Sequence, residues 1–184
     1  MFKKLNFNLP ELDLTRLKGK FFEEYGDSQR GRFSMYNISD QEYFEHIVSQ
    51  KLRFHIKPYI TGISELPIGT VLPHQDENSV TLNYMIHSAN AITLFWKPKN
   101  ADVDREPLLE MGARTVSGTI GYRREELELN GYFQACDQEA WLLKTDEIHS
   151  VVVTNHSVIR QMVYWRWRSP HTFEEILNSI EILQ

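Results

Sequence analysis

The sequence has a single cysteine, Cys136, and this scarcity excludes two structural devices. One cysteine cannot form a disulfide within the chain, and it supplies too few thiolates for a cysteine-based zinc cluster. We expect Cys136 to act as a small hydrophobic residue rather than as a nucleophile. The chain of 184 residues is nevertheless long enough to bury a core without such cross-links.

Long apolar runs are also lacking. No segment approaches the roughly 20 apolar residues of a membrane-spanning helix, and residues 1–14 contain no run typical of a signal peptide. The net charge of −5 argues mildly against a surface that binds nucleic-acid phosphates. No repeat, low-complexity segment or linker is apparent. We therefore expect a cytoplasmic globular protein with one domain over residues 1–184, and neither nucleic acid nor membrane as a partner. The oligomeric state is left open.

The chain is rich in short β-type runs from about residue 52 onward. In Val80–Ile86, for example, apolar and polar residues alternate, as they do in half-buried strands. Many short strands separated by turn residues favour a β-sandwich or jelly roll over an α/β fold. The expected strands are Leu52–Ile56, Tyr59–Ile63, Gly69–Pro73, Val80–Ile86, Ile92–Trp96, Thr115–Ile120, Ala140–Lys144, Ser150–Thr154 and Ile159–Trp167.

Two helices are expected to flank this β-rich core. Ser39 and Glu42 form a capping-box pattern, so the first helix is expected to begin near Ser39. Thr172 and Glu175 repeat the pattern before an apolar stripe, which predicts a C-terminal helix over residues 172–183. This helix either packs on the sheet or forms a dimer face. The core then covers about 52–168, after an N-terminal extension of 1–51. We expect 99–112 to be an exposed loop and 125–130 to be a helical turn or loop.

His74 and Asp76 form the first part of a candidate metal site. They lie two residues apart, and on an extended strand this spacing places both side chains on the same face. An imidazole and a carboxylate provide two of the three ligands in the 2-His-1-carboxylate triad of non-haem Fe(II) oxygenases. Alone, the pair is a weak signal, since chance matches to so short a motif are common.

The second part of the site lies far downstream. His149 begins a strongly β-forming run, and Arg160 follows 11 residues later. We expect the two strands to pair in an antiparallel hairpin through residues 154–157, which would bring His149 and Arg160 together. On the last strand, Trp165 and Trp167 are expected on one face and Arg160, Tyr164 and Arg166 on the other. A buried arginine requires an anion, and its fork matches a carboxylate.

Taken together, these residues resemble a known signature. His74 and Asp76, a distal His149 and then Arg160 resemble the motif of 2-oxoglutarate/Fe(II)-dependent dioxygenases, which have a double-stranded β-helix, a cupin-like jelly roll. The runs Thr81–Ile86 and Ile92–Trp96 are similar to core strands of the aspartyl/asparaginyl β-hydroxylase-like branch. The resemblance covers about residues 52–168.

The resemblance implies a function and a set of site residues. His74, Asp76 and His149 would bind Fe(II), and Arg160 would pair with the distal carboxylate of 2-oxoglutarate. Asn83 and, more weakly, Thr93 would contact the co-substrate. Met162 stands where relatives have serine or threonine, so the second carboxylate contact is left to Tyr84 or Tyr164. The implied reaction uses O2 to hydroxylate an amino-acid side chain or a small molecule, with release of succinate and CO2.

Two other classes of function remain open. A cupin-like metal protein could carry out isomerase or lyase chemistry without oxidation, and a jelly roll could serve as a binding module without catalysis. Arg160 discriminates the first of these from the oxygenase, because a 2-oxoglutarate partner gives that arginine a reason to be there. Pocket walls from loops 99–114 and 121–139 are expected to set the substrate, and loops carry no readable pattern for it.

Overall fold

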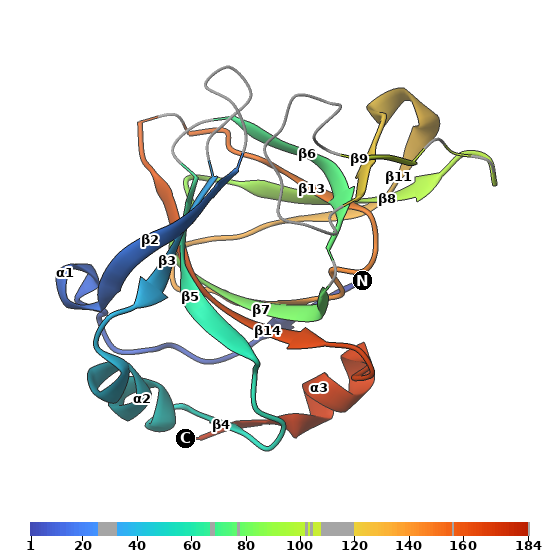
Figure 1. Cartoon of the computed structure of the whole chain (residues 1–184). Helices are drawn as coiled ribbons and strands as arrows, with labels where there is room; N and C mark the ends of the chain where they lie inside the picture. The colour runs from blue at the N-terminus through green and yellow to red at the C-terminus, as the bar shows by residue number, and fades with distance from the viewer. Residues whose placement is uncertain are drawn as a thin grey trace.

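The computed structural model describes residues 1–25, 33–66, 69–76, 78–101, 103, 105–107, 120–155 and 157–183. Two antiparallel sheets face each other, and helices α2 and α3 lie beneath the seven-stranded sheet, which is the lower one in Figure 1. The seven-stranded sheet has the order β1-β12-β7-β14-β5-β3-β2, and the six-stranded sheet has the order β11-β8-β13-β6-β10-β9. A small third sheet pairs β15 with β4.

The strands of the seven-stranded sheet are β1 (Phe2–Leu5), β2 (Lys18–Tyr25), β3 (Phe33–Ile38), β5 (Ile60–Leu66), β7 (Asn78–His87), β12 (Ala140–Leu143) and β14 (Arg160–Arg168). Those of the six-stranded sheet are β6 (Thr70–Gln75), β8 (Ile92–Pro98), β9 (Arg105–Pro107), β10 (Ile120–Tyr122), β11 (Leu127–Gln134) and β13 (His149–Val152). The small sheet contains β4 (Leu52–Phe54) and β15 (Ile180–Ile182). The helices are α1 (Leu14–Leu17), α2 (Gln41–Ser49), the 3₁₀ turn η1 (Arg124–Glu126) and α3 (Phe173–Ser179).

Eight of these strands form a jelly roll. The neighbours β12, β7, β14 and β5 in one sheet face β11, β8, β13 and β6 in the other. Along the chain the strands change sheet at each step from β5 to β8, and again from β11 to β14. Two four-stranded antiparallel sheets wound in this way are a double-stranded β-helix. The mainly β fold class expected from the sequence is therefore confirmed, with β1, β2 and β3 extending the larger sheet.

The main core lies outside the barrel, between the seven-stranded sheet and its helices. Trp165 and Trp167 of β14 are buried there, and they pack with Phe44 of α2 and Ile176 of α3. A smaller cluster around Phe95 fills part of the space between the two sheets. The two β14 tryptophans thus face outward from the barrel. The alternate residues of β14 face the interior, as the sequence predicted.

The helix boundaries differ from the expected ones. The N-cap of α2 is Asp40, whose carboxylate accepts a hydrogen bond from the Tyr43 amide at 2.9 Å, because the Ser39 hydroxyl donates instead to the Arg16 carbonyl. The capping box at Thr172 is confirmed. However, α3 ends at Ser179 instead of 183, because Ile180–Ile182 pairs with β4 as a strand. β-Branched residues favour that extended state.

The strand predictions were correct over most of the core and incomplete elsewhere. Eight expected runs correspond to strands, whereas 115–119 of the ninth lie outside the described residues and its last residue, Ile120, begins β10. In the expected loop 99–112, residues 102, 104 and 108–112 lie outside the described residues, and Arg105–Pro107 forms strand β9 instead of loop. The segment expected as a turn or loop at 125–130 is η1 followed by β11. Strand β11 lies at the sheet edge and buries Leu127 and Phe133 but exposes Leu129 and Tyr132, so its apolar residues do not follow one buried face.

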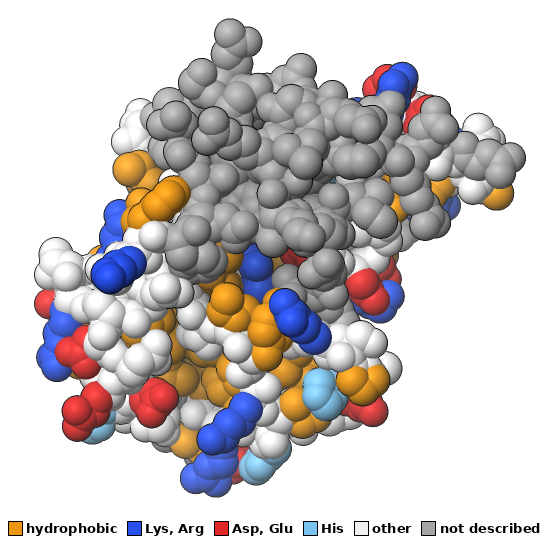
Figure 2. Space-filling model, viewed as in Figure 1, with side chains coloured by type: hydrophobic (Ala, Val, Ile, Leu, Met, Phe, Trp, Pro, Cys, Tyr) orange, Lys and Arg blue, Asp and Glu red, His pale blue; other side chains and the backbone are white. Residues whose placement is uncertain are grey.

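One face of the molecule shows no large patch of a single charge among its described residues. On the face shown in Figure 2, described acidic and basic side chains are interspersed around hydrophobic ones. Within the described ranges, no helix combines the length and the apolar character that crossing a membrane requires.

Candidate metal centre and its facing sheet

His74, Asp76 and His149 meet at one end of the six-stranded sheet. His74 lies near the end of β6, Asp76 follows that strand, and His149 begins β13 directly opposite His74. The imidazole centroids are 4.3 Å apart, and His74 Nε2 lies 3.4 Å from Asp76 Oδ1. One ligand atom from each residue lies within 4.8 Å of the other two, so the group can hold a metal ion. The structure thus brings together the three residues that the sequence singled out.

Two backbone carbonyls orient the imidazoles. His74 Nδ1 lies 2.7 Å from the Leu72 carbonyl oxygen, and His149 Nδ1 lies 2.9 Å from that of Glu147. A carbonyl only accepts hydrogen bonds, so each Nδ1 must carry the proton. In the neutral rings, Nε2 then keeps its lone pair. Metal-binding histidines are commonly fixed in this way by a carbonyl on the other ring nitrogen.

The electrostatics of the centre suit cation binding. Burial would raise the pKa of Asp76, but the hydrogen bond and charge of His74 outweigh it and hold that pKa well below its usual range. Burial lowers the pKa of His149 to about 4, and the charge of His74 adds to this effect. Burial also acts to lower the pKa of His74, but the hydrogen bond and charge of Asp76 raise it overall. Near neutral pH, Asp76 is therefore ionised and His149 is neutral, as metal ligation requires.

Arg160 lies on the opposite sheet, at the start of β14. Its side chain is only 3% exposed, and burial lowers its pKa to about 10. Among the described residues, no group accepts a hydrogen bond from its Nε. Its neighbour on the adjacent strand β5 is Leu66, which is buried with Ala91 and Val153 inside the barrel. A buried guanidinium with an orphaned donor is costly unless an anion binds it.

Other predicted contact residues also face the interior. Asn83 of β7 is 5% exposed, and its Oδ1 has no partner among the described residues. Thr93 of β8 is 3% exposed and shares a strand face with Phe95, which packs between the sheets. The interior of the barrel is therefore lined partly by polar groups, several of which are orphaned.

Two expectations about the site are wrong. Strands β13 and β14 do not pair: β13 pairs with β6 and β8, whereas β14 pairs with β5 and β7. Their connection crosses from one sheet to the other, so His149 and Arg160 lie on opposite sheets instead of side by side in a hairpin. Tyr84 cannot supply the second carboxylate contact, because its ring stacks on Phe7 on the outer side.

Ser64 was not predicted as a site residue, and Arg166 was predicted only to share a strand face with Arg160 and Tyr164. Ser64 of β5 is 1% exposed, lies opposite Met162 and has an orphaned hydroxyl within the described part of the chain. Arg166 of β14 lies opposite Thr81, whose hydroxyl is 3.2 Å from that of Thr145, next to Asp76, and its charge acts to lower the pKa of all three metal-binding residues. A serine in a strand gives no signal in the sequence, and only the topology places it inside.

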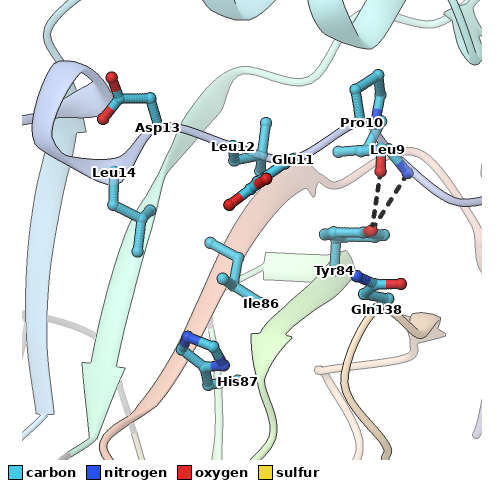
Figure 3. Close-up of a pocket in the computed structure, with 10 residues that line it drawn as sticks. All are labelled: Leu9, Pro10, Glu11, Leu12, Asp13, Leu14, Tyr84, Ile86, His87 and Gln138. Carbon is cyan, nitrogen blue, oxygen red and sulfur yellow. Dashed lines mark hydrogen bonds between the residues drawn. The ribbon is translucent and has the colours of Figure 1, made fainter.

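A separate cleft lies on the outer side of the seven-stranded sheet. It has a volume of about 660 Å³ and separates residues 9–14 from the end of β7 (Figure 3). The Tyr84 hydroxyl bridges it by accepting a hydrogen bond from the Leu9 amide at 3.2 Å. None of its lining residues belongs to the metal-binding group.

Comparison with known proteins gives no family. No protein-family model matches the sequence, and no curated protein matches it. Among solved structures, E. coli ycfD aligns with 97% of this chain at 9% identity and a TM-score of 0.48. The non-heme alpha ketoglutarate dependent epimerase SnoN aligns with 79% at 11% identity and a TM-score of 0.38. Hazelnut (Corylus avellana) vicilin aligns with 85% at 8% identity and a TM-score of 0.39.

These similarities are distant. This chain spans 31% of the vicilin chain, 51% of the ycfD chain and 67% of the SnoN chain. Identities and TM-scores this low assign no function, and the jelly roll rests on the strand order itself.

Proposed function

We propose that the protein is an Fe(II)- and 2-oxoglutarate-dependent dioxygenase that hydroxylates an amino-acid side chain or a small molecule. One observation carries the proposal: a group of two histidines and one carboxylate lies on one sheet, and a buried arginine with an orphaned donor lies on the facing sheet. When bound, Fe(II) and 2-oxoglutarate supply, with O2, the oxidation that releases succinate and CO2.

The residues divide the binding task between the two sheets. His74 and His149 would offer Nε2, and Asp76 would offer a carboxylate oxygen; three ligands from one side leave positions open for a co-substrate. Arg160 would pair with the distal carboxylate of 2-oxoglutarate. Its guanidinium fork suits a carboxylate better than a point charge does.

The remaining orphaned groups fit the same co-substrate. Asn83 and Ser64 lie on strands that flank β14, and both have an unsatisfied oxygen inside the barrel. Buried polar atoms are rarely left without a partner, so a polar ligand between the sheets explains them together. Thr93, on the other sheet, is a further candidate contact.

The main alternative is a cupin-like metal protein with isomerase or lyase activity, and a non-catalytic binding module is a second. The first uses the same metal ligands, the second keeps the fold without a metal, and neither requires the buried charge of Arg160. A charge in this position costs several kcal/mol without a partner, so its presence favours a dicarboxylate ligand.

The deciding experiment is an anaerobic titration of the protein with Fe(II) and 2-oxoglutarate, followed by visible absorption. We expect a metal-to-ligand charge-transfer band in the wild type, no band in His149→Ala and a band that requires much more 2-oxoglutarate in Arg160→Ala. His87→Ala is the matched control, because His87 is about half exposed and lies 3.6 Å from Asp137, outside the site. Bound iron without a band in folded wild type would favour the alternatives.

A further inference from the structure

Arg166 is a second arginine on the interior face of β14. Its neighbours Trp165 and Trp167 are buried in the outer core, so Arg166 projects to the opposite side, toward the six-stranded sheet. Its guanidinium lies 4.6 Å from the centre of the Tyr164 ring, which belongs to the same strand face. Arg166 is partly buried. It lies six residues along the strand from Arg160, a separation of roughly 20 Å at about 3.3 Å per residue.

A chain of contacts connects this end of β14 with the metal-binding residues. Arg166 lies opposite Thr81 of β7, and the Thr81 hydroxyl lies 3.2 Å from that of Thr145. The Thr145 carbonyl in turn accepts a hydrogen bond from the Asp76 amide at 3.0 Å. The effect of the Arg166 charge on the pKa values of the three metal-binding residues agrees with this placement. Arg166 is thus near the metal-binding residues, and Arg160 lies at the opposite end of strand β14.

Within the described ranges the Arg166 guanidinium makes no ion pair, and the carboxylate that senses its charge, Asp76, belongs to the metal-binding group. Its contacts are the Tyr164 ring and the Met35 sulfur, which lies 4.0 Å from Nη2. Among the described residues, no group accepts a hydrogen bond from Arg166 Nε, and no carboxylate forms an ion pair with it. An arginine that is partly removed from water and has only an aromatic and a thioether contact is prepared for an oxyanion.

We propose that Arg166 binds an oxyanion of the primary substrate, a carboxylate or a phosphate, and so positions the substrate beside the metal. The inference rests on the proposed function, because it counts the charges present when Fe(II) and 2-oxoglutarate are bound. Fe(II), ionised Asp76, the 2-oxoglutarate dianion and Arg160 together carry no net charge, so the positive charge of Arg166 remains for another anion. The substrate class is therefore an acidic small molecule or an acidic or phosphorylated side chain.

The test uses protein with ¹⁵N-labelled arginine, loaded with diamagnetic Zn(II) and 2-oxoglutarate. The Nε–Hε signal of Arg166 is identified by its absence in Arg166→Lys and followed by NMR during titration with sodium acetate or inorganic phosphate. We expect a saturable downfield shift with at least one anion, and the anion that acts identifies a carboxylate or a phosphate group. The Nε–Hε signal of Arg168, which lies over the exposed Tyr59 ring, should not saturate.

Sodium chloride at matched ionic strength separates binding from screening. A shift that chloride reproduces, or no saturable shift with either oxyanion, overturns the proposal. Saturation by 2-oxoglutarate alone overturns it as well, because Arg166 would then belong to the co-substrate site. If the wild type binds no 2-oxoglutarate but Arg166 still responds to acetate, the oxygenase fails and an anion site remains. In Arg166→Lys, calorimetry should show anion binding at least about tenfold weaker, because lysine lacks the fork.

Discussion

At the scale of single residues, the orientation of the two imidazoles matters as much as their proximity. The carbonyls of Leu72 and Glu147 fix Nδ1 of His74 and His149, so Nε2 is preset before any ion arrives. Loss of an outer partner of a metal ligand typically costs 10–100-fold in affinity. Removing a ligand itself should cost more. We therefore expect His149→Ala and Asp76→Asn each to weaken Zn(II) binding by more than about 100-fold at neutral pH.

Calorimetry with Zn(II) measures this effect, and His87→Ala again provides the control. Its imidazole lies near Asp137 on the surface, so its removal should leave Zn(II) affinity within about twofold of the wild type. Equal affinities for wild type and His149→Ala would show that the ion binds elsewhere.

Replacing Arg160 is expected to have opposite effects on stability and on 2-oxoglutarate binding. Because its buried charge has an orphaned donor, replacing it with a hydrophobic residue removes a desolvation penalty. In the ligand-free protein, we expect Arg160→Leu to leave the free energy of unfolding unchanged or to raise it by about 1–4 kcal/mol. The same variant should lose the response to 2-oxoglutarate. Urea unfolding of the two ligand-free proteins measures the first effect.

A large loss of stability in Arg160→Leu would contradict this account. It would mean that the guanidinium already holds a structural anion or carbonyl in the folded chain, and that its burial is not evidence for a ligand. Arg168→Leu, on the same strand but with an exposed side chain, controls for the effect of leucine in β14.

At the scale of elements, a polar bridge joins three strands of the larger sheet. Glu65 of β5 accepts hydrogen bonds from Lys18 of β2 and Gln161 of β14, each at 2.8 Å. Burial would raise the Glu65 pKa, but these hydrogen bonds outweigh it and lower the pKa from its ordinary 4.5. The stability that the ionised carboxylate contributes is therefore present above pH 4.5. It is lost as the pH falls through the lower pKa of the folded state.

Glu65→Gln tests that bridge. At neutral pH we expect it to lower the free energy of unfolding by about 1–3 kcal/mol, because it removes hydrogen bonds to a charged group. Below pH 4.5 the difference between variant and wild type should shrink, since protonated glutamate resembles glutamine. Urea unfolding at neutral and acidic pH measures both values. A difference that does not change with pH would mean that ionised Glu65 does not stabilise the fold.

The sequence predicted those elements whose side chains alternate between a buried and an exposed environment. Strand β7 was predicted from its alternating apolar and polar residues, although Val80–Met85 are buried on both faces. Strand β1 was missed because Lys3 and Lys4 interrupt its four residues, and only pairing with β12 makes it a strand. The end of α3 was misplaced because the partner of Ile180–Ile182 is β4, far away in the sequence. Local patterns therefore predict strands better than strand partners.

The site residues likewise divide into those recognisable from a local pattern and those that depend on strand pairing. His74 and Asp76 are recognisable because two residues on one strand face are a local relation. That Arg160 and His149 lie on facing sheets depends on β13 and β14 belonging to different sheets, which the sequence did not predict. Ser64 and the position of Arg166 near Asp76 follow from strand register alone.

At the scale of the whole molecule, a bound co-substrate would join the two sheets. The metal ligands lie on the six-stranded sheet and Arg160 lies on the seven-stranded sheet, so 2-oxoglutarate would contact both. A ligand that binds only the folded state stabilises it by about 2.7 kcal/mol at 100 times its Kd. For a chain of this size, that corresponds to a rise in Tm of about 5–10 °C. We expect 2-oxoglutarate to produce such a rise when Zn(II) is present and little rise without it.

Pyruvate provides the matched ligand for this experiment. It presents the same keto acid to the metal but lacks the distal carboxylate, so its smaller effect on Tm should be the same in wild type and Arg160→Leu. The additional stabilisation by 2-oxoglutarate should disappear in Arg160→Leu, whereas the effect of Zn(II) alone should remain. In His149→Ala both effects should be lost. If 2-oxoglutarate and pyruvate raise the wild-type Tm equally, no distal carboxylate reaches Arg160. The metal centre would then belong to a jelly roll with other chemistry, because the bridge between its sheets is what distinguishes the oxygenase.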